Sequence, residues 1–146
     1  ALVLLVVTGC SSFQKSSWSF LFSGSKRYSI IRTAEKYLGV RYKFGGDSPR
    51  GFNCSGYTMY VYRVHGMELP HSAGGQYERG RRIGIKNARP GDLVFFKIYG
   101  RKISHVGVYA GNYKFIHAPS RGKRVSYDDI RKDYWRKRYA GTVTFF

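Results

Sequence analysis

The stretch GFNCSGY at residues 51–57 decides how this chain is interpreted. It places Cys54 where a glycine-rich loop is followed by residues 54–64, whose apolar side chains recur at helical spacing. The dipole and free amides of a helix N-terminus stabilise a thiolate, which lowers the pKa of the thiol, and the same amides can stabilise an oxyanion. We therefore expect Cys54 to be a nucleophile at a helix start, although an arbitrary cysteine is more often simply buried.

Two histidines, His105 and His117, follow on adjacent predicted strands at residues 105–110 and 113–118. If residues 110–112 form a three-residue loop, Tyr109 pairs with Tyr113 and His105 lies directly across from His117 on the same face. With a two-residue loop the pairing slips by one residue, and the two rings point to opposite faces. The hypothesis that His105 is a base oriented by His117 requires the first register.

The remaining periodicity predicts an α+β domain in which N-terminal helices pack on an antiparallel sheet of about five strands. Glycines make residues 40–53 and 69–86 irregular in this prediction, and Asp128 or Asp129 is expected near the cap of the last helix. The predicted helices are 29–38, 54–64 and 128–136, and the predicted strands are 93–98, 105–110, 113–118, 124–127 and 142–146.

The N-terminal residues have the composition of an export signal. Residues 1–7 are apolar but too few to span a bilayer, which takes about 20 apolar residues. The sequence VTGC at residues 7–10 resembles the lipobox of bacterial lipoproteins, so we expect a signal peptide (1–10) that ends at a lipidated Cys10. A plain signal peptide or a buried strand are the alternatives.

This interpretation divides the chain into the signal peptide, a flexible tether (11–27) and a folded domain (28–146). It predicts a protein of the cell envelope that is anchored to a membrane by lipid. Resemblance to such lipoproteins also implies that Ser11 favours the outer membrane, facing the periplasm. A lipidated Cys10 cannot pair with Cys54, which is then a free thiol in an oxidising compartment.

The chain of 146 residues has 26 Lys and Arg against 8 Asp and Glu, a formal net charge of +18. Such a charge attracts polyanions, among them anionic lipids and the polymers of a bacterial envelope. We do not expect nucleic acid to be the partner, because the chain has no recognition motif and carries an export signal.

Zinc binding is an alternative use of Cys54, His105 and His117. A single thiolate without paired ligand spacing disfavours it, and we expect neither a metal nor another cofactor. We assign His65 and His71 to surface or loop roles, because neither lies in a motif.

Six segments in sequence order resemble the NlpC-type family of bacterial cell-wall cysteine peptidases, which have a trimmed papain-like fold. They are YKFGG (42–46), NCSG (53–56), LPHS (69–72) with Gln76, RPGDLVFF (89–96), SHVGVY (104–109) and FIHA (115–118). The resemblance implies that Cys54 is the nucleophile, His105 the base and His117 the orienting residue. It also implies that Tyr42, Asn53 and Ser55 contact substrate.

The family usually has Asp where this chain has Asn53, and that carboxylate can bind the ammonium of a free peptide N-terminus. A murein-attached stem peptide therefore fits this chain better. The resemblance implies a monomeric, lipid-anchored endopeptidase that cuts peptidoglycan stem peptides or cross-links at diaminopimelate. The alternatives are a non-catalytic basic module that binds peptidoglycan, and an amidase or acyltransferase that uses the same thiol.

Overall fold

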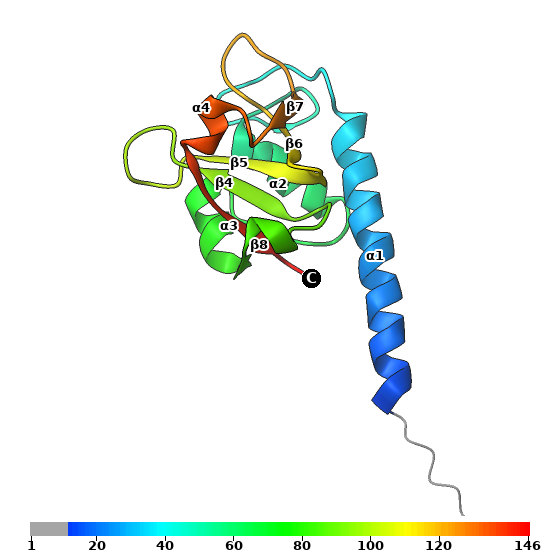
Figure 1. Ribbon diagram of the computed structural model, residues 1–146. Coiled ribbons are helices and arrows are strands. Elements are labelled where there is room, and N and C mark those ends of the chain that lie inside the picture. Colours follow the sequence, from blue (N-terminus) through cyan, green and yellow to red (C-terminus); the bar gives the residue numbers. More distant parts are fainter. Residues whose placement is uncertain (1–11) are drawn as a thin grey trace, which may run out of the picture.

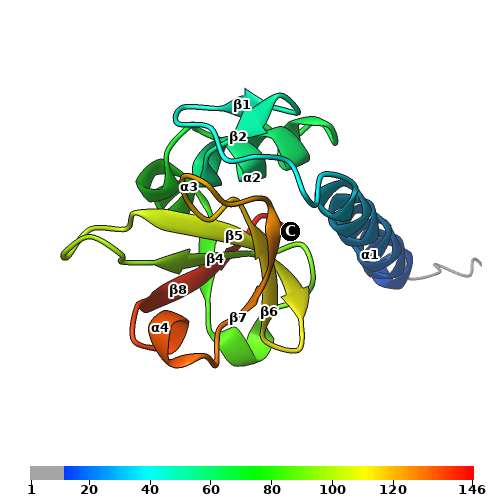
Figure 2. The same cartoon turned by 90° about the horizontal axis from the view of Figure 1, so that it is seen from above.

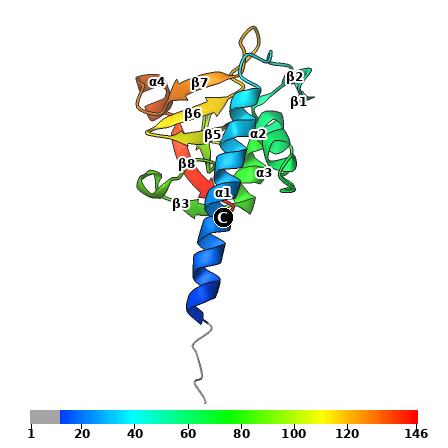
Figure 3. The ribbon, with the colours of Figure 1, turned by 90° about the vertical axis from the view of Figure 1, so that its right-hand side faces the viewer.

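The computed structural model describes the backbone of residues 12–146 and the side chains from residue 24 onward, so the predicted signal peptide and Cys10 lie outside the described residues. A long helix, α1 (Ser12–Lys36), stands beside a domain of mixed helix and sheet (Figure 1). Its C-terminal half packs on the domain, and its N-terminal half projects beyond it (Figure 3).

A six-stranded antiparallel sheet forms the centre of the domain, in the order β3-β8-β4-β5-β6-β7. Two further strands, β1 (Asp47–Ser48) and β2 (Gly51–Phe52), pair separately before the helix that begins at Cys54. The α+β class is confirmed, with six strands in place of about five. The strands of the main sheet are β3 (Arg81–Ile83), β4 (Leu93–Phe96), β5 (His105–Gly111), β6 (Lys114–His117), β7 (Ser126–Asp129) and β8 (Tyr139–Thr144).

Helices cover both faces of this sheet (Figure 2). The helix α2 (Cys54–Arg63) shares a core with Val106 and Val108 of β5, and on the other face Tyr109 packs with Trp135 of α4 (Asp133–Arg136). Side chains along a strand alternate between faces, so β5 supplies both cores.

The first helix differs from the sequence prediction. Residues 12–27, expected within the flexible tether, form one continuous helix with the segment predicted at 29–38. Arg27 gives the physical reason for its docking, because its buried guanidinium Nη1 lies 2.7 Å from Asp92 Oδ1 and its Nη2 donates to Thr144 Oγ1 at 3.1 Å. A buried charge needs such partners, which the sequence pattern alone does not show.

The prediction of irregular structure at 69–86 was wrong. The segment contains α3 (Ala73–Arg79), β3 and the 3-10 helix η1 (Ile85–Asn87). Ser72 caps α3, since its hydroxyl accepts a hydrogen bond from the Gly75 amide at 3.1 Å. The cap explains how a glycine-rich sequence starts a helix.

The helix predicted at 128–136 was also wrong in its first half. Asp128 and Asp129 belong to β7, where they pair with Phe115 and Lys114 of β6, and α4 begins only at Asp133. Neither acidic residue is a helix cap, because pairing with a neighbouring strand overrides the local preference.

Candidate active site

Cys54 is the first residue of α2, as the sequence predicted. The Asn53 side chain caps this helix by accepting a hydrogen bond from the Gly56 amide at 2.7 Å. A Cβ on Gly56 would lie 2.0 Å from the Gly46 carbonyl oxygen, so glycine is required where the helix start meets the preceding loop. Capping and this close approach together fix the position of the thiol.

The thiol lies against the backbone on both sides of His105. Its Sγ donates to the Ser104 carbonyl at 3.8 Å, and the backbone amides of Val106, Ser55 and Cys54 itself act to lower the pKa of the thiol. Burial nevertheless raises the pKa of the Cys54 thiol, because desolvation of the thiolate outweighs these amides. The expected lowering of this pKa was therefore wrong, and the resting thiol is neutral at neutral pH.

The register of β5 and β6 differs from both predicted loops. Gly111 pairs with Lys114 across a two-residue turn, in which Asn112 and Tyr113 have φ of 48° and 61°. The ladder then shifts, so that Tyr109 pairs with Phe115 rather than with Tyr113. His105 is therefore not directly across from His117, and that part of the prediction was wrong.

The bulge at Ala110 brings the two imidazoles to the same face of the sheet. A two-residue turn alone would place the histidines on opposite faces, but the extra residue in β5 shifts the pairing by one. His105 and His117 then meet diagonally on one face, with His105 Nε2 and His117 Nδ1 2.7 Å apart. Gly107 keeps this face open, since a Cβ there would lie 2.7 Å from the Phe115 ring.

Both imidazoles are buried on the face that α4 covers. The Trp135 ring stacks on His105 at a centroid distance of 5.4 Å and meets His117 edge-on at 5.0 Å. Trp135 was not predicted to lie beside the site, because a single aromatic residue in a basic segment forms no helical or strand-like pattern of apolar residues. The thiol at the start of α2 and the His105 imidazole at the start of β5 both line one cavity.

Burial keeps both histidines neutral. It is the main cause that holds the pKa of His105 well below its usual range, and His117 adds to the effect. Burial likewise lowers the pKa of His117 to about 4, with Lys123 and Lys132 contributing and Asp128 opposing. Asp128 Oδ2 lies 3.8 Å from His117 Nε2. The pair is thus in its basic form at neutral pH.

A cavity of about 450 Å³ opens above Cys54 and His105. Two aromatic side chains at its rim, Phe44 and Tyr99, are 77% and 79% exposed. The full lining is Tyr42, Phe44, Cys54, Ile98, Tyr99, Ser104, His105, Pro119, Ser120 and Arg121. The structure therefore brings Tyr42, Cys54 and His105 to one opening, with His117 behind His105.

Two residues predicted to contact substrate, Asn53 and Ser55, are not among the residues that line this cavity. The Asn53 side chain caps α2 and lies 3.1 Å from His71 Nε2. Ser55 is buried, and its carbonyl accepts a hydrogen bond from Gln76 Nε2 at 3.0 Å. Their role in substrate binding stays a prediction.

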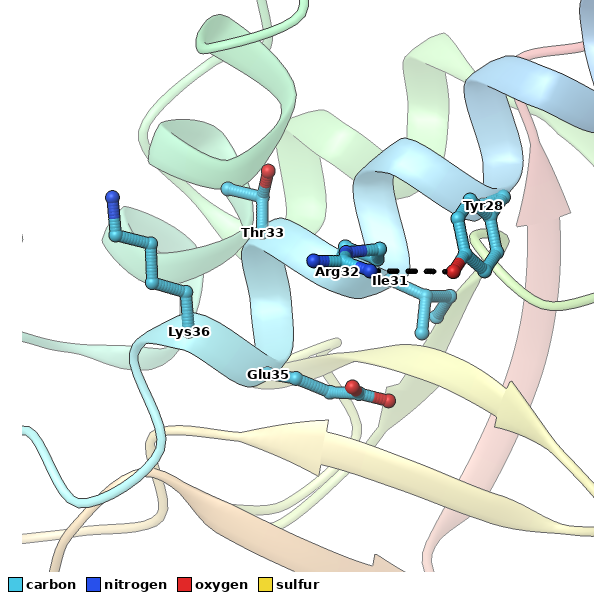
Figure 4. Close-up of a pocket in the computed structure, with 6 residues that line it drawn as sticks. All are labelled: Tyr28, Ile31, Arg32, Thr33, Glu35 and Lys36. Atoms are coloured by element: carbon cyan, nitrogen blue, oxygen red, sulfur yellow. Dashed lines mark hydrogen bonds between the residues drawn. The ribbon is translucent and has the colours of Figure 1, made fainter.

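Another hollow, of about 700 Å³, runs along α1 and is lined by residues of that helix alone (Figure 4). Arg32 donates to the Tyr28 hydroxyl at 3.4 Å, and the Tyr127 hydroxyl donates to Glu35 at 2.9 Å, which ties α1 to β7. This hollow shares no lining residue with the cavity above Cys54 and is lined by neither cysteine nor histidine.

Within residues 12–146, no helix combines the length and the apolar character that crossing a membrane requires. Across the same part of the chain, His, Cys, Asp and Glu side chains form no group of three or more with the arrangement of a metal site.

Comparison with known proteins matches residues 39–144 to the NlpC/P60 family. The chain is 48% identical over 112 residues to "Probable endopeptidase p60" of Listeria monocytogenes, covering 77% of this chain and 22% of that protein. It is 38% identical over 148 residues to "Gamma-DL-glutamyl hydrolase" of Bacillus subtilis, covering 92% and 36%. It is 42% identical over 104 residues to "Murein DD-endopeptidase MepS/Murein LD-carboxypeptidase" of Escherichia coli K12, covering 70% and 54%.

Among solved structures, the NlpC/p60 domain of the peptidoglycan hydrolase SagA superposes with a TM-score of 0.72 at 32% identity, covering 82% of this chain and 98% of that one. The matches span only 22% to 54% of the lengths of these three sequence relatives, which are longer than this chain. The matched region contains Cys54, His105 and His117.

Proposed function

The chain belongs to the NlpC/P60 family, and from this premise we propose that it is a cysteine peptidase that hydrolyses peptide bonds of peptidoglycan. One observation carries the proposal above all others: Cys54 and His105 line one cavity, and His117 holds His105 through a 2.7 Å contact. The relatives named as endopeptidases and the solved domain of a peptidoglycan hydrolase support the substrate class.

The proposed reaction begins with a neutral thiol and a neutral imidazole. Since His105 Nε2 is engaged by His117, its other ring nitrogen, Nδ1, takes the Cys54 proton as the sulfur attacks the substrate carbonyl. The amides at the start of α2 stabilise the resulting oxyanion. Moving the proton during the attack avoids a free thiolate, whose formation burial disfavours.

Collapse of the tetrahedral intermediate breaks the C–N bond, and the His105 imidazolium gives its proton to the leaving amine. A thioester between Cys54 and the acyl group remains. His105 then removes a proton from water, and the hydroxide oxygen bonds to the acyl carbon. The C–S bond breaks as the sulfur takes a proton back from the His105 imidazolium, which regenerates the neutral thiol and imidazole. The net result is one peptide bond and one water converted to a carboxylic acid and an amine.

The test is digestion of purified sacculi, with released peptides identified by mass spectrometry. Cys54→Ala and His105→Ala are each expected to lower turnover at least about 1000-fold while the far-ultraviolet spectrum stays unchanged. His65→Ala is the matched control, since His65 contacts Thr33 of α1 and lies outside the cavity. Undiminished turnover by Cys54→Ala contradicts the proposal, as does wild-type protein that binds sacculi without releasing peptide.

The names of the relatives give three activities, a murein DD-endopeptidase, a murein LD-carboxypeptidase and a γ-DL-glutamyl hydrolase. We propose a stem peptide or cross-link of murein, in keeping with Asn53 in place of the acidic residue that would bind a free N-terminus. The masses of the released muropeptides assign the bond, and a product that retains the cross-link but lacks part of the stem favours the glutamyl linkage.

The envelope location is a separate proposal that depends on the lipobox-like residues 7–10. We propose that Cys10 carries lipid and anchors a monomeric enzyme to the outer membrane. Incorporation of labelled palmitate into the wild-type chain, and its loss in Cys10→Ala, is the expected result. Equal labelling of both chains contradicts it.

A further inference from the structure

We propose that Asp128 is a positioning residue that sets which nitrogen of His117 carries the proton, and through it makes His105 a base. This inference concerns the proposed catalytic site. It starts from an unpartnered group: His117 Nε2 is buried and has no hydrogen-bond partner among the described residues. Asp128 Oδ2, at 3.8 Å, is a carboxylate beside it.

The structure holds the Asp128 carboxylate next to this nitrogen. Asp128 Oδ1 lies 2.9 Å from Lys132 Nζ and accepts a hydrogen bond from the Asp129 amide at 2.9 Å. Burial opposes ionisation of Asp128, but these contacts and a hydrogen bond from Trp135 together outweigh it and lower the pKa of Asp128, so the carboxylate is ionised. An anion there favours the tautomer in which His117 Nε2 carries hydrogen.

That tautomer of His117 determines the direction of the hydrogen bond between His117 and His105, and with it which nitrogen of His105 can accept the thiol proton. With hydrogen on Nε2, His117 Nδ1 is an acceptor, so His105 must donate from its own Nε2 across the 2.7 Å contact. His105 Nδ1 then has a free lone pair for the thiol proton. In the opposite tautomer His117 donates to His105, the hydrogen of His105 sits on Nδ1, and the thiol has no base.

Other charges face the two imidazoles, and they do not serve this role. Lys123 and Lys132 both lower the pKa of His117, and each is a donor that cannot accept its proton. His105 contacts His117 at Nδ1, and so it does not face the Nε2 atom. Asp129, the neighbouring carboxylate, is bound instead to Arg131 and Lys114.

The test combines kinetics with long-range ¹H–¹⁵N spectra, which report the tautomer without any hydrolysis. Wild-type His117 is expected to show the Nε2–H form, and Asp128→Asn to lose that preference. The same variant should lower kcat about 10- to 100-fold with KM nearly unchanged. The acid limb of its pH–rate profile should move to lower pH, since Asp128 raises the pKa of His117. Asp128→Glu should restore part of kcat.

Asp133→Asn is the matched control, because Asp133 is exposed and its carboxylate forms a surface ion pair with Arg136. An Nδ1–H form of His117 in the wild-type protein overturns the proposal, whether or not any variant folds. Wild-type kcat and pH profile in Asp128→Asn overturn it as well. Absence of hydrolysis by the wild-type protein would instead contradict the proposed function, and the tautomer measurement would still decide this inference.

A second observation independently carries another inference. A hollow of about 320 Å³ is lined by Arg41, Tyr42, Gly122, Lys123 and Arg124, and it shares Tyr42 with the catalytic cavity. We propose that this hollow binds a carboxylate of the peptide substrate while the scissile bond lies at Cys54.

Charge and proximity support this assignment. Three cations line the hollow, no acidic residue lines either opening, and Arg121 of the catalytic cavity lies over the Phe44 ring at 5.8 Å. The charges also reach neighbouring groups: burial raises the pKa of Tyr42 and Arg121 partly opposes that rise, while Lys123 adds to the lowering of the His117 pKa that burial causes. A γ-linked glutamyl residue in the proposed substrate retains a free α-carboxylate close to its amide bonds. The negative charge of this carboxylate is complementary to the positive charges that line the hollow.

The test uses L-alanyl-γ-D-glutamyl-lysine with the glutamyl α-carboxyl either free or amidated, and measures binding to the Cys54→Ala protein by calorimetry. The free acid is expected to bind about 10-fold more tightly, and Lys123→Gln combined with Arg41→Gln to remove this preference. Lys86→Gln combined with Lys137→Gln, two residues that line neither opening, controls for the loss of two positive charges. Equal binding of both peptides overturns the inference, as does equal loss of preference in the control; neither result bears on hydrolysis.

Discussion

The Arg27 cluster joins α1 to the turn before β4, and the His105 cluster joins the neighbouring strands β5 and β6. Both are buried polar contacts, but they treat charge in opposite ways. At the α1 interface the Arg27 guanidinium faces the Asp92 carboxylate at 2.7 Å. At the catalytic interface two imidazoles meet at 2.7 Å with their charged forms suppressed by burial. The first arrangement compensates a charge permanently, whereas the second keeps a neutral base available for a proton.

The largest expected effect on stability separates the two clusters. Asp92→Asn leaves the buried Arg27 charge without its counterion, and we expect the free energy of unfolding to fall by about 3–5 kcal/mol in urea titrations. The kcat of the folded protein should stay unchanged, because Asp92 lies outside the catalytic cavity. Asp133→Asn, at an exposed ion pair, should change stability by less than about 1 kcal/mol. Equal effects of the two variants would contradict the comparison.

The pH dependence of stability probes the histidine side of the comparison. Burial lowers the pKa of His117 from 6.5 to about 4 in the folded state, so between these values the unfolded chain binds more protons. Stability is therefore complete above pH 6.5 and falls as the pH drops toward 4, by up to about 3 kcal/mol. Urea titrations at several pH values measure the slope.

His117→Asn removes one of the two buried imidazoles and should reduce that dependence, whereas Cys54→Ala should leave it as in the wild-type protein. Unfolding free energies with the same slope in all three proteins would show that another group dominates the acid sensitivity.

The smallest expected effect concerns the thiol itself. Burial raises the pKa of Cys54, so the rate of iodoacetamide alkylation should increase with pH along a curve whose midpoint lies above that of a small free thiol measured in parallel. A midpoint below that of the free thiol would indicate a preformed thiolate–imidazolium pair, and the neutral starting state of the proposed reaction would then be wrong.

Much of the catalytic site was predictable because its signals are local. The helical spacing after Cys54 is a property of a few neighbouring residues, and α2 begins where it predicts. The cap at Asn53 is equally local but was not predicted. The strands that contain His105 and His117 were found from alternation in the same way. The six segments added the expected family, which the comparison confirmed.

The errors arose where partners distant in sequence decide. Asp128 was expected at a helix cap, yet pairing with Phe115 places it in β7 beside His117. The Ala110 bulge was not predicted, and the histidines meet diagonally rather than across the ladder. Burial of the thiol reversed the expected direction of its pKa shift, since a sequence motif contains the helix dipole but not the desolvation.

The amino-acid sequence by itself determined which residues could react and on which elements they lie, because caps, periodicity and turn residues act over a few positions. The tertiary structure alone decided the register that joins His105 to His117, the carboxylate that faces the second imidazole and the neutral state of all three reactive side chains. Those features depend on packing and on exclusion of water by segments far apart in the chain, and no short stretch of residues specifies them.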